Sequence, residues 1–279
     1  MWTRAVVVAM VVTSVVGIGC AGQSAKPSTV EAQALVVRGN NGLAVALYHQ
    51  LQNAPSNLFF SPYSVSTALA MAYAGAEDAT QEQMAQTLRY PTSAQALQKL
   101  GLTQEPLTQE QFDKAFGQVI KDLNAQNGRN RNELRVANAL WGQMDYEFAK
   151  AFVSTVGKRY NGNFQEVDFI TGLEEVYLVI NVWVEKQTNG KIKNLIEKGM
   201  LTPLTRLVLT NAIYFKGKWA SPFQAELTQE EPFTLVGGGK VQVYMMNRQD
   251  KFGYAQTDVM QMLELPYAGD KLSMVILLP

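Results

Sequence analysis

The chain has 279 residues, of which 47% are hydrophobic and 17% are charged, and this length and composition suit one large globular domain. Its 24 Lys and Arg residues balance its 24 Asp and Glu residues, so no basic surplus favours nucleic acid as a partner. His49 and Cys20 are the only histidine and the only cysteine, which nearly excludes a Ser/His/Asp or Cys/His hydrolase and rules out a disulfide within the chain. The sequence therefore predicts a protein that is not an enzyme and that uses no metal ion and no cofactor.

Residues 1–20 are predicted to be an export signal rather than part of the fold. Arg4 precedes an apolar run over residues 5–18, which is too short for a comfortable membrane span. The run ends in "VVGIGC", which resembles a bacterial lipoprotein cleavage box at Cys20, although Gly17 stands where that pattern prefers a leucine-like residue. Two alternatives stay open: lipidation of Cys20, which would anchor the protein to a membrane, or an ordinary signal peptide with an incidental cysteine. Either one places the protein outside the cytoplasm, in the extracellular or periplasmic space.

A small, polar segment over residues 21–36 is predicted to be a tether. The first predicted helix covers residues 41–54, with Leu43, Leu47 and Leu51 on one face and His49 off that face, in solvent. The chain beyond the tether, residues 37–279, is predicted to form a single domain.

The next segment combines a short strand with a buried helix. Residues 57–60 are apolar and predict a strand, and Ser61 can cap a helix whose first position is Pro62. This helix runs to Gly75 and is apolar or small nearly all round, so it should be buried. Its Ser64 would then need a hydrogen-bond partner in the interior.

Four further helices are predicted in the middle of the chain. Two of them begin at capping boxes, Thr80 with Gln83 and Thr108 with Gln111. The other two cover residues 146–162 and 173–192, and the last has Val176, Ile180 and Trp183 on one side.

Strands dominate the second half. The segments "ELRVANALWGQ" (133–143) and "FQEVDF" (164–169) predict strands, and "TRLVLTNAIYFKGKW" (205–219) is a run of β-formers typical of a central strand covered on both faces. "EPFTL" and "KVQVYMM" flank the glycines at 237–239, which predict a hairpin tip. These glycines do not form a phosphate loop, because a strand follows them and a GK[ST] ending is missing. Three more strands follow up to residue 278, so the order of elements predicts an α+β fold.

Several of these stretches together resemble the serpin family. They are "NLFFSPYSVSTALAMAYAGA" (57–76), "TQEQM" (80–84), "INVWVEKQTNGKI" (180–192), "LVLTNAIYFKGKWASPF" (207–223) and "MLELPYAGDKLSMVILLP" (262–279), in the order that the family has them. The resemblance implies one serpin-like domain, with the N-terminal helices packed on a large central sheet and with further antiparallel sheets. It also implies an inhibitor that traps a serine or cysteine protease when a cleaved reactive loop inserts into the central sheet as an extra strand.

The resemblance assigns roles to particular residues. Ser61, Ser64 and Asn211 match the family's shutter, where polar side chains hold the central strands that part during insertion. Trp219 matches the tryptophan of the breach, where insertion begins. For Ser61, helix capping alone is an equally good explanation. The helix that contains Trp183 resembles the one that lies across the sheet and must yield.

The sequence also departs from the family pattern. The family's shutter includes a histidine on a later strand, whereas the only histidine here is His49. The hinge, the reactive-site loop and two closing strands would lie beyond Pro279, so the C-terminal part of the fold is expected to be missing and the chain to be inactive as it stands. The expected partner of the complete protein, which we expect to be a monomer, is a target protease. The alternative is a non-inhibitory binding protein on the same fold.

Overall fold

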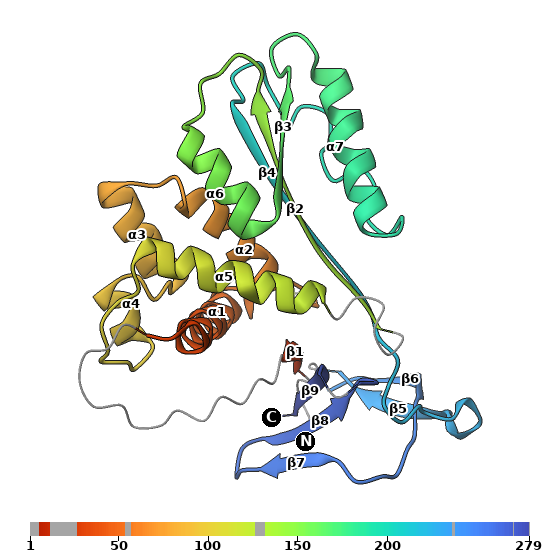
Figure 1. Cartoon of the computed structure of the whole chain (residues 1–279). Coiled ribbons are helices and arrows are strands. Elements are labelled where there is room, and N and C mark those ends of the chain that lie inside the picture. Colours follow the sequence, from red (N-terminus) through yellow and green to blue (C-terminus); the bar gives the residue numbers. More distant parts are fainter. Residues whose placement is uncertain are drawn as a thin grey trace. The chain divides into compact units, whose positions relative to one another are not determined.

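A computed structural model describes residues 6–11, 27–53, 57–125, 132–235, 238–269 and 271–278 (Figure 1). The chain divides into two compact units, each described here by itself. The larger unit comprises Val16–Ala125 and Arg135–Tyr214, and the smaller unit comprises Met1–Val15, Gln126–Leu134 and Phe215–Pro279. The sequence predicted one domain over residues 37–279 and contains no signal for this division. The mixture of helices and sheets confirms the predicted α+β class.

The larger unit holds all seven α-helices of the described residues and most of a three-stranded sheet of order β3-β2-β4; the start of β2 and the end of β4 belong to the smaller unit. The helices are α1 (Thr29–Leu51), α2 (Pro62–Tyr73), α3 (Asp78–Leu88), α4 (Ala94–Lys99), α5 (Gln109–Asn124), α6 (Lys150–Tyr160) and α7 (Leu173–Gln187). The strands are β2 (Glu133–Gln143), β3 (Gly162–Val167) and β4 (Leu207–Lys216). Strands β2 and β3 are parallel, with Asn138 opposite Gly162.

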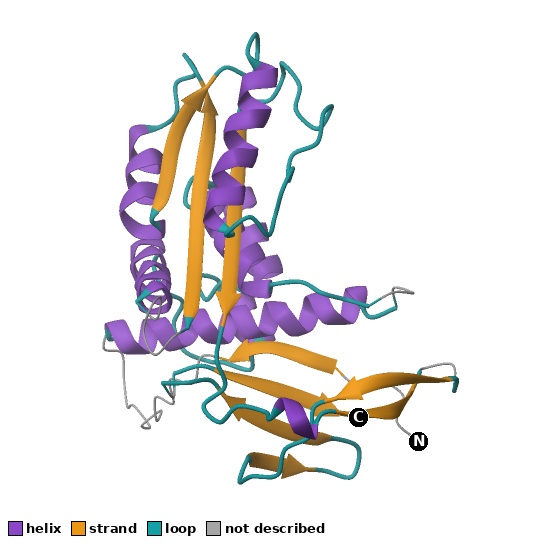
Figure 2. Ribbon diagram, turned by 90° about the vertical axis from the view of Figure 1, so that its right-hand side faces the viewer, coloured by secondary structure: helices purple, strands orange, loops and turns teal. Residues whose placement is uncertain are grey.

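Two apolar cores cover the two faces of this sheet. Leu140 of β2 and Leu207 and Leu209 of β4 pack into the core formed by α1, α2, α3, α5 and α6. Trp141 of β2 and Val208 of β4 pack into a second core with α7. Because successive side chains of a strand point to opposite faces, β4 packs apolar side chains on both, as the sequence predicted. It lies at the end of the described sheet, however, rather than at its centre. Figure 2 looks onto the α7 side of the sheet.

The smaller unit is built mainly of antiparallel strands. One sheet has the order β1-β9-β8-β7, from β1 (Val6–Val11), β7 (Gly253–Gln256), β8 (Gln261–Pro266) and β9 (Ser273–Leu278). Strands β5 (Gln229–Thr234) and β6 (Lys240–Met245) pair as the predicted hairpin, after the short 3-10 helix η2 (Ala225–Leu227). Strand β1 comes from the predicted export signal and pairs antiparallel with β9.

The first helix begins earlier than the sequence predicted. Ser28 caps α1 in a capping box with Glu31, and Ala32, Leu35 and Val36 are buried in the core. Residues 29–36 are therefore helical rather than part of a tether. The run "RGNNG" over residues 38–42 concealed this start, because its polar and glycine residues interrupt the apolar stripe between Val36 and Leu43.

Two other local predictions are wrong. Residues 57–60 form no strand, and Phe59 is almost fully exposed, at 99%. Helix α3 begins at Asp78 with Glu77 at its N-cap, so Thr80 lies inside the helix and caps nothing. The capping box of Thr108 and Gln111 is confirmed at the start of α5.

Candidate functional site

The polar site of the larger unit starts at the first turn of α2. Ser61 is the N-cap residue, and its hydroxyl accepts a hydrogen bond of 3.2 Å from the backbone N–H of Ser64. Pro62 occupies the first turn, where its missing N–H leaves no bond unmade. Helix capping, as predicted, thus accounts for Ser61.

Ser64 connects α2 to the sheet. Its hydroxyl donates a hydrogen bond to Oδ1 of Asn211, which lies on β4 on the same face as Leu207 and Leu209. The amide Nδ2 of Asn211 in turn donates to Oδ1 of Asn138 on the neighbouring strand β2, at 2.6 Å. The structure therefore brings Ser64 and Asn211 together as the sequence predicted.

Asn138 is the member of this site that the sequence analysis missed. Its side chain is only 2% exposed, and its Nδ2 donates to the carbonyl oxygen of Tyr160, the last residue of α6, at 3.1 Å. Both ends of the amide are thus satisfied, as a buried polar group requires. The sequence did contain a signal for this residue: in the predicted strand, the polar Asn138 occupies an inward position between the apolar Val136 and Leu140.

The network continues from α6 to α5. The hydroxyl of Tyr160 donates to Oδ1 of the buried Asp113 at 2.5 Å, and Nε2 of Gln109 donates to the same oxygen at 2.9 Å. Burial raises the pKa of the Asp113 carboxyl, and the hydrogen bonds from Tyr160 and Gln109 only partly oppose this effect. The pKa of Tyr160 is raised by its burial and by the charge of Asp113.

This network lies next to the last strand of the sheet. In the order β3-β2-β4, strand β4 has β2 on one side and no other described strand on its far side. An edge strand presents unpaired backbone N–H and C=O groups, to which a further strand can pair. Asn211 therefore lies on the edge strand of the described sheet, where a further strand could pair.

On the other face of the sheet, α7 is fastened by apolar and polar contacts. Its residues Ile180 and Val184 are fully buried against β2, and the rings of Trp183 and Trp141 meet edge to face at 6.0 Å. Asn181 exchanges two hydrogen bonds with the backbone of Ile196, each of 2.9 Å. The helix is thus tied to the segment that follows it in the chain.

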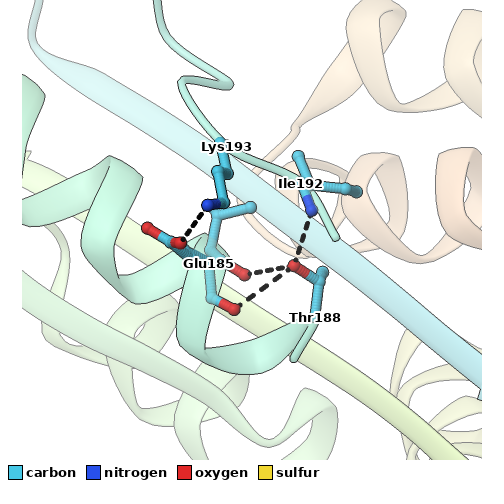
Figure 3. Close-up of polar contacts among 5 residues, drawn as sticks. Glu185, Thr188, Ile192 and Lys193 are labelled. Carbon is cyan, nitrogen blue, oxygen red and sulfur yellow. Dashed lines mark hydrogen bonds and ion pairs between the residues drawn. The ribbon is translucent and has the colours of Figure 1, made fainter. Parts of the chain in front are cut away.

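Thr188 is the C-cap residue of α7 (Figure 3). Its hydroxyl donates to the carbonyl oxygen of Val184 at 2.9 Å and accepts from the backbone N–H of Ile192 at 3.1 Å. Glu185 and Lys193 add an ion pair of 3.4 Å on the surface. One threonine therefore holds both the last turn of the helix and the loop after it.

Trp219 lies in the smaller unit. Its ring stacks on the ring of Tyr267, with centroids 4.6 Å apart and planes 8° from parallel, and Phe223 meets it edge-on. The backbone pairs beside the stack, because Ala220 N–H donates to the Pro266 carbonyl at 2.9 Å. A Cβ at Gly217 would lie 2.6 Å from both the Phe215 and Tyr267 rings, so this close packing requires glycine.

The other predicted site residues are either outside the described part of the chain or belong to no site in it. Cys20 lies outside the described residues, and the reactive-site loop was predicted outside the given sequence. His49 is exposed on α1, as predicted. Among the residues that the structure describes, no three His, Cys, Asp or Glu side chains gather as a metal site would need, and no helix is long and apolar enough to span a membrane.

Comparison with known proteins gives one consistent family. The family profile described as Serpin (serine protease inhibitor) matches residues 38–279. An uncharacterized serpin-like protein of Methanosarcina mazei is 36% identical over 262 residues, which are 91% of this chain and 58% of that protein. The leukocyte elastase inhibitor of Bos taurus is 38% identical over 244 residues, which are 86% of this chain and 60% of that protein.

Solved structures show the same likeness. The structure of cleaved Serpin 42Da matches with a TM-score of 0.75 and 33% identity, covering 90% of this chain and 63% of that one. An Arabidopsis serpin in its native stressed conformation matches with a TM-score of 0.72 and 27% identity, covering 91% and 62%. The chain thus spans somewhat less than two thirds of the length of these relatives.

Proposed function

Because this chain belongs to the serpin family, we propose that the protein inhibits serine or cysteine proteases by inserting a cleaved reactive loop into its central sheet. The family as a whole supports an inhibitor of proteases rather than a catalyst. The observation that carries the insertion step is the position of β4 at the open side of the described sheet, with Asn211 hydrogen-bonded to Ser64 and Asn138 beside it.

Ser64, Asn211 and Asn138, with Ser61 at the helix cap, would act as the shutter. Asn211 is bonded to α2 through Ser64 and to β2 through Asn138, so it opposes a shift of β4 relative to either element. Each of these is a side-chain hydrogen bond, which the two partners can exchange for a hydrogen bond to another group. A strand added beside β4 would gain a ladder of backbone hydrogen bonds, which would offset the rearrangement.

Helix α7 would be the element that yields on the opposite face. Its contacts with Ile196 and Ile192 are few and local, whereas its apolar face is the main barrier to displacement. Trp219, stacked on Tyr267 in the smaller unit, would keep the structure of the breach intact through packing.

The test is complex formation with proteases. The chain, extended through whatever coding sequence follows codon 279, is mixed with a panel of serine and cysteine proteases, and an SDS-resistant covalent complex is expected with at least one. Residues 1–279 expressed alone are expected to form none. Clean cleavage of the extended protein without any complex, across a broad panel, would contradict the insertion mechanism and favour a non-inhibitory binding protein.

We also propose that the protein is exported and acts as a monomer on its target protease. The support for export is the sequence of residues 1–20, in which Arg4 precedes the apolar run over residues 5–18. Mass spectrometry of the mature N-terminus distinguishes a lipid-modified Cys20 from an ordinary cleavage product. A Cys20→Ser variant that stays in the membrane fraction would contradict lipidation.

A further inference from the structure

An open pocket of about 490 Å³ lies in the larger unit between α1 and the ends of α3 and α4. Its lining includes three basic side chains, Arg38, Arg89 and Lys99, together with His49, and no carboxylate of the described residues belongs to it. No residue of the sheet lines it either, so the pocket is separate from the site that carries the proposed function. In a chain with equal numbers of acidic and basic residues, this is a local concentration of positive charge.

Helix α1 supplies one wall of the pocket from a single face. Arg38, Gly42, Val45 and His49 follow one another at spacings of four, three and four residues, which places them on one stripe of the helix. A Cβ at Gly42 would lie 2.5 Å from the side chain of Leu100, so the glycine lets the end of α4 come close to α1. The lining therefore combines an apolar part, formed by Val45, Ala46 and Leu100, with the exposed basic side chains of Arg38 and Lys99, called the rim here.

The backbone of Arg89 is fixed between the end of α3 and helix α1. It ends α3 in the left-handed conformation, with φ 61°, and its backbone N–H donates to the Ala85 carbonyl. A Cβ at Gly39 would lie 2.3 Å from the Arg89 carbonyl oxygen, so α1 packs directly on this backbone. Its Nη1 atom is buried and has no hydrogen-bond partner among the described residues.

The cations of the pocket also lack counter-charges. The ion pairs found among the described residues join Lys193 to Glu185, Lys198 to Glu174 and Arg248 to Asp250. None of them involves Arg38, Arg89 or Lys99. Like charges brought together at a partly buried site repel one another, and a bound anion would relieve both that repulsion and the unmet hydrogen bond of Arg89.

We propose that this pocket binds a tetrahedral oxyanion, a phosphate or sulfate group, carried by a ligand with a small apolar part. The guanidinium of Arg89 donates to the anion oxygens from the buried side, while Arg38 and Lys99 approach from the rim. The apolar part of the ligand lies on Val45, Ala46 and Leu100. This site does not depend on the insertion of a loop or on a protease.

The test is a titration of the full chain with inorganic phosphate, inorganic sulfate and phenyl phosphate, at constant ionic strength kept with sodium chloride. Binding is followed by the NMR shifts of the Gly39, Gly42 and Arg89 amides. We expect saturation with phosphate or sulfate, and several-fold tighter binding of phenyl phosphate because its ring covers the apolar residues of the lining. The two inorganic anions distinguish a phosphate site from a sulfate site.

The variants Arg38→Gln and Lys99→Gln remove exposed cations and are each expected to weaken phenyl phosphate binding about tenfold, the loss of one charge-assisted contact. Lys158→Gln is the matched control, because Lys158 is an exposed lysine on α6 that does not line the pocket. Lys99→Arg keeps the charge and should keep most of the affinity. Linear shifts without saturation, or an equal loss of affinity in Lys158→Gln, would overturn the proposal.

Discussion

Asn211 on β4 donates a hydrogen bond of 2.6 Å to Asn138 on β2, and the same Asn211 accepts one from Ser64 on α2. This one amide joins two neighbouring strands and a helix. Asn138 is 2% exposed, so water cannot easily replace a partner that it loses. Loss of the Asn211 side chain should therefore destabilise the fold.

Asn211→Ala should lower the free energy of unfolding by about 2–3 kcal/mol, because it leaves Ser64 Oγ and the buried Asn138 Oδ1 without their partners. Urea denaturation measures the loss. Asn138→Ala should cost a similar amount, and the double variant should cost clearly less than the sum, since both changes break the same contact. The control is Asn247→Ala on the surface, expected to change stability by less than about 0.5 kcal/mol. Additive losses from Asn138 and Asn211 would show that the two amides do not depend on each other.

The buried carboxyl of Asp113 predicts a pH dependence with a definite sign. Because burial raises its pKa in the folded state, the folded protein binds more protons than the unfolded chain at pH values between the unfolded and the folded pKa. Stability contributed by Asp113 is therefore present at low pH and is lost as the pH rises through the folded pKa. The charged and titratable groups that face it are Tyr160, Tyr73 and Arg159.

Asp113→Asn removes this titration while keeping an oxygen that accepts from Tyr160 and Gln109. The difference in unfolding free energy between the original protein and this variant, measured from pH 3 upward, should shift in favour of the variant as the pH rises. Glu110→Gln, an exposed carboxyl in the same helix, should show no such trend. A pH-independent difference for Asp113→Asn would contradict the raised pKa.

The hydroxyl of Thr188 predicts local stability at the end of α7 (Figure 3). Thr188→Val keeps the shape of the side chain but removes its bonds with Val184 and Ile192, so the loop should open more readily. We expect amide exchange of Ile192 to accelerate by about five- to thirtyfold, equivalent to about 1–2 kcal/mol of local stability.

Lys193→Gln is the control for this change. Its ion pair with Glu185 is solvent-exposed, with 65% and 44% of the two side chains accessible, and such pairs contribute only about 0–1 kcal/mol. Exchange at Ile192 should therefore change little. If Lys193→Gln accelerated it as much as Thr188→Val, the ion pair rather than the hydroxyl would hold the loop.

Gly217 predicts a steric effect at the Trp219 stack. Gly217→Ala would bring a methyl group to within 2.6 Å of the Phe215 and Tyr267 rings, and overpacking of this kind costs about 1–3 kcal/mol. The loss should appear in urea unfolding together with a changed near-UV circular dichroism from Trp219.

Gly157→Ala is the matched glycine replacement in α6. Its Cβ would meet only one atom, at 3.9 Å, and removing a helical glycine should stabilise the protein by up to about 1 kcal/mol. Opposite signs for the two replacements would establish close packing at Gly217. An unchanged stability for Gly217→Ala would show that the aromatic rings can move apart.

The sequence by itself determined most of the helices and strands and the identity of the family. Some features depend only on residues that are close in the sequence, so local chemistry is enough to predict them. They are the capping of α2 by Ser61, the capping box of Thr108 and the apolar face of α7. Local reasoning failed at the start of α1, where the polar and glycine run of residues 38–42 interrupts the apolar pattern. It also failed at residues 57–60, where an apolar run finds no strand partner among the described residues. Strand formation depends on pairing, which lies outside any local window.

The tertiary structure alone decided which polar side chains meet. Ser64 and Asn211 are 147 residues apart in the chain, and Asn138 and Asn211 are 73 apart. Family resemblance assigned Ser64 and Asn211 to one site, but it did not include Asn138. The residues around a single asparagine in a strand do not indicate which distant residue it will bind. The same reason conceals the pocket of Arg38, Arg89 and Lys99, whose cations come from three separate segments. Buried polar groups require partners, and only the folded chain brings those partners within hydrogen-bonding distance.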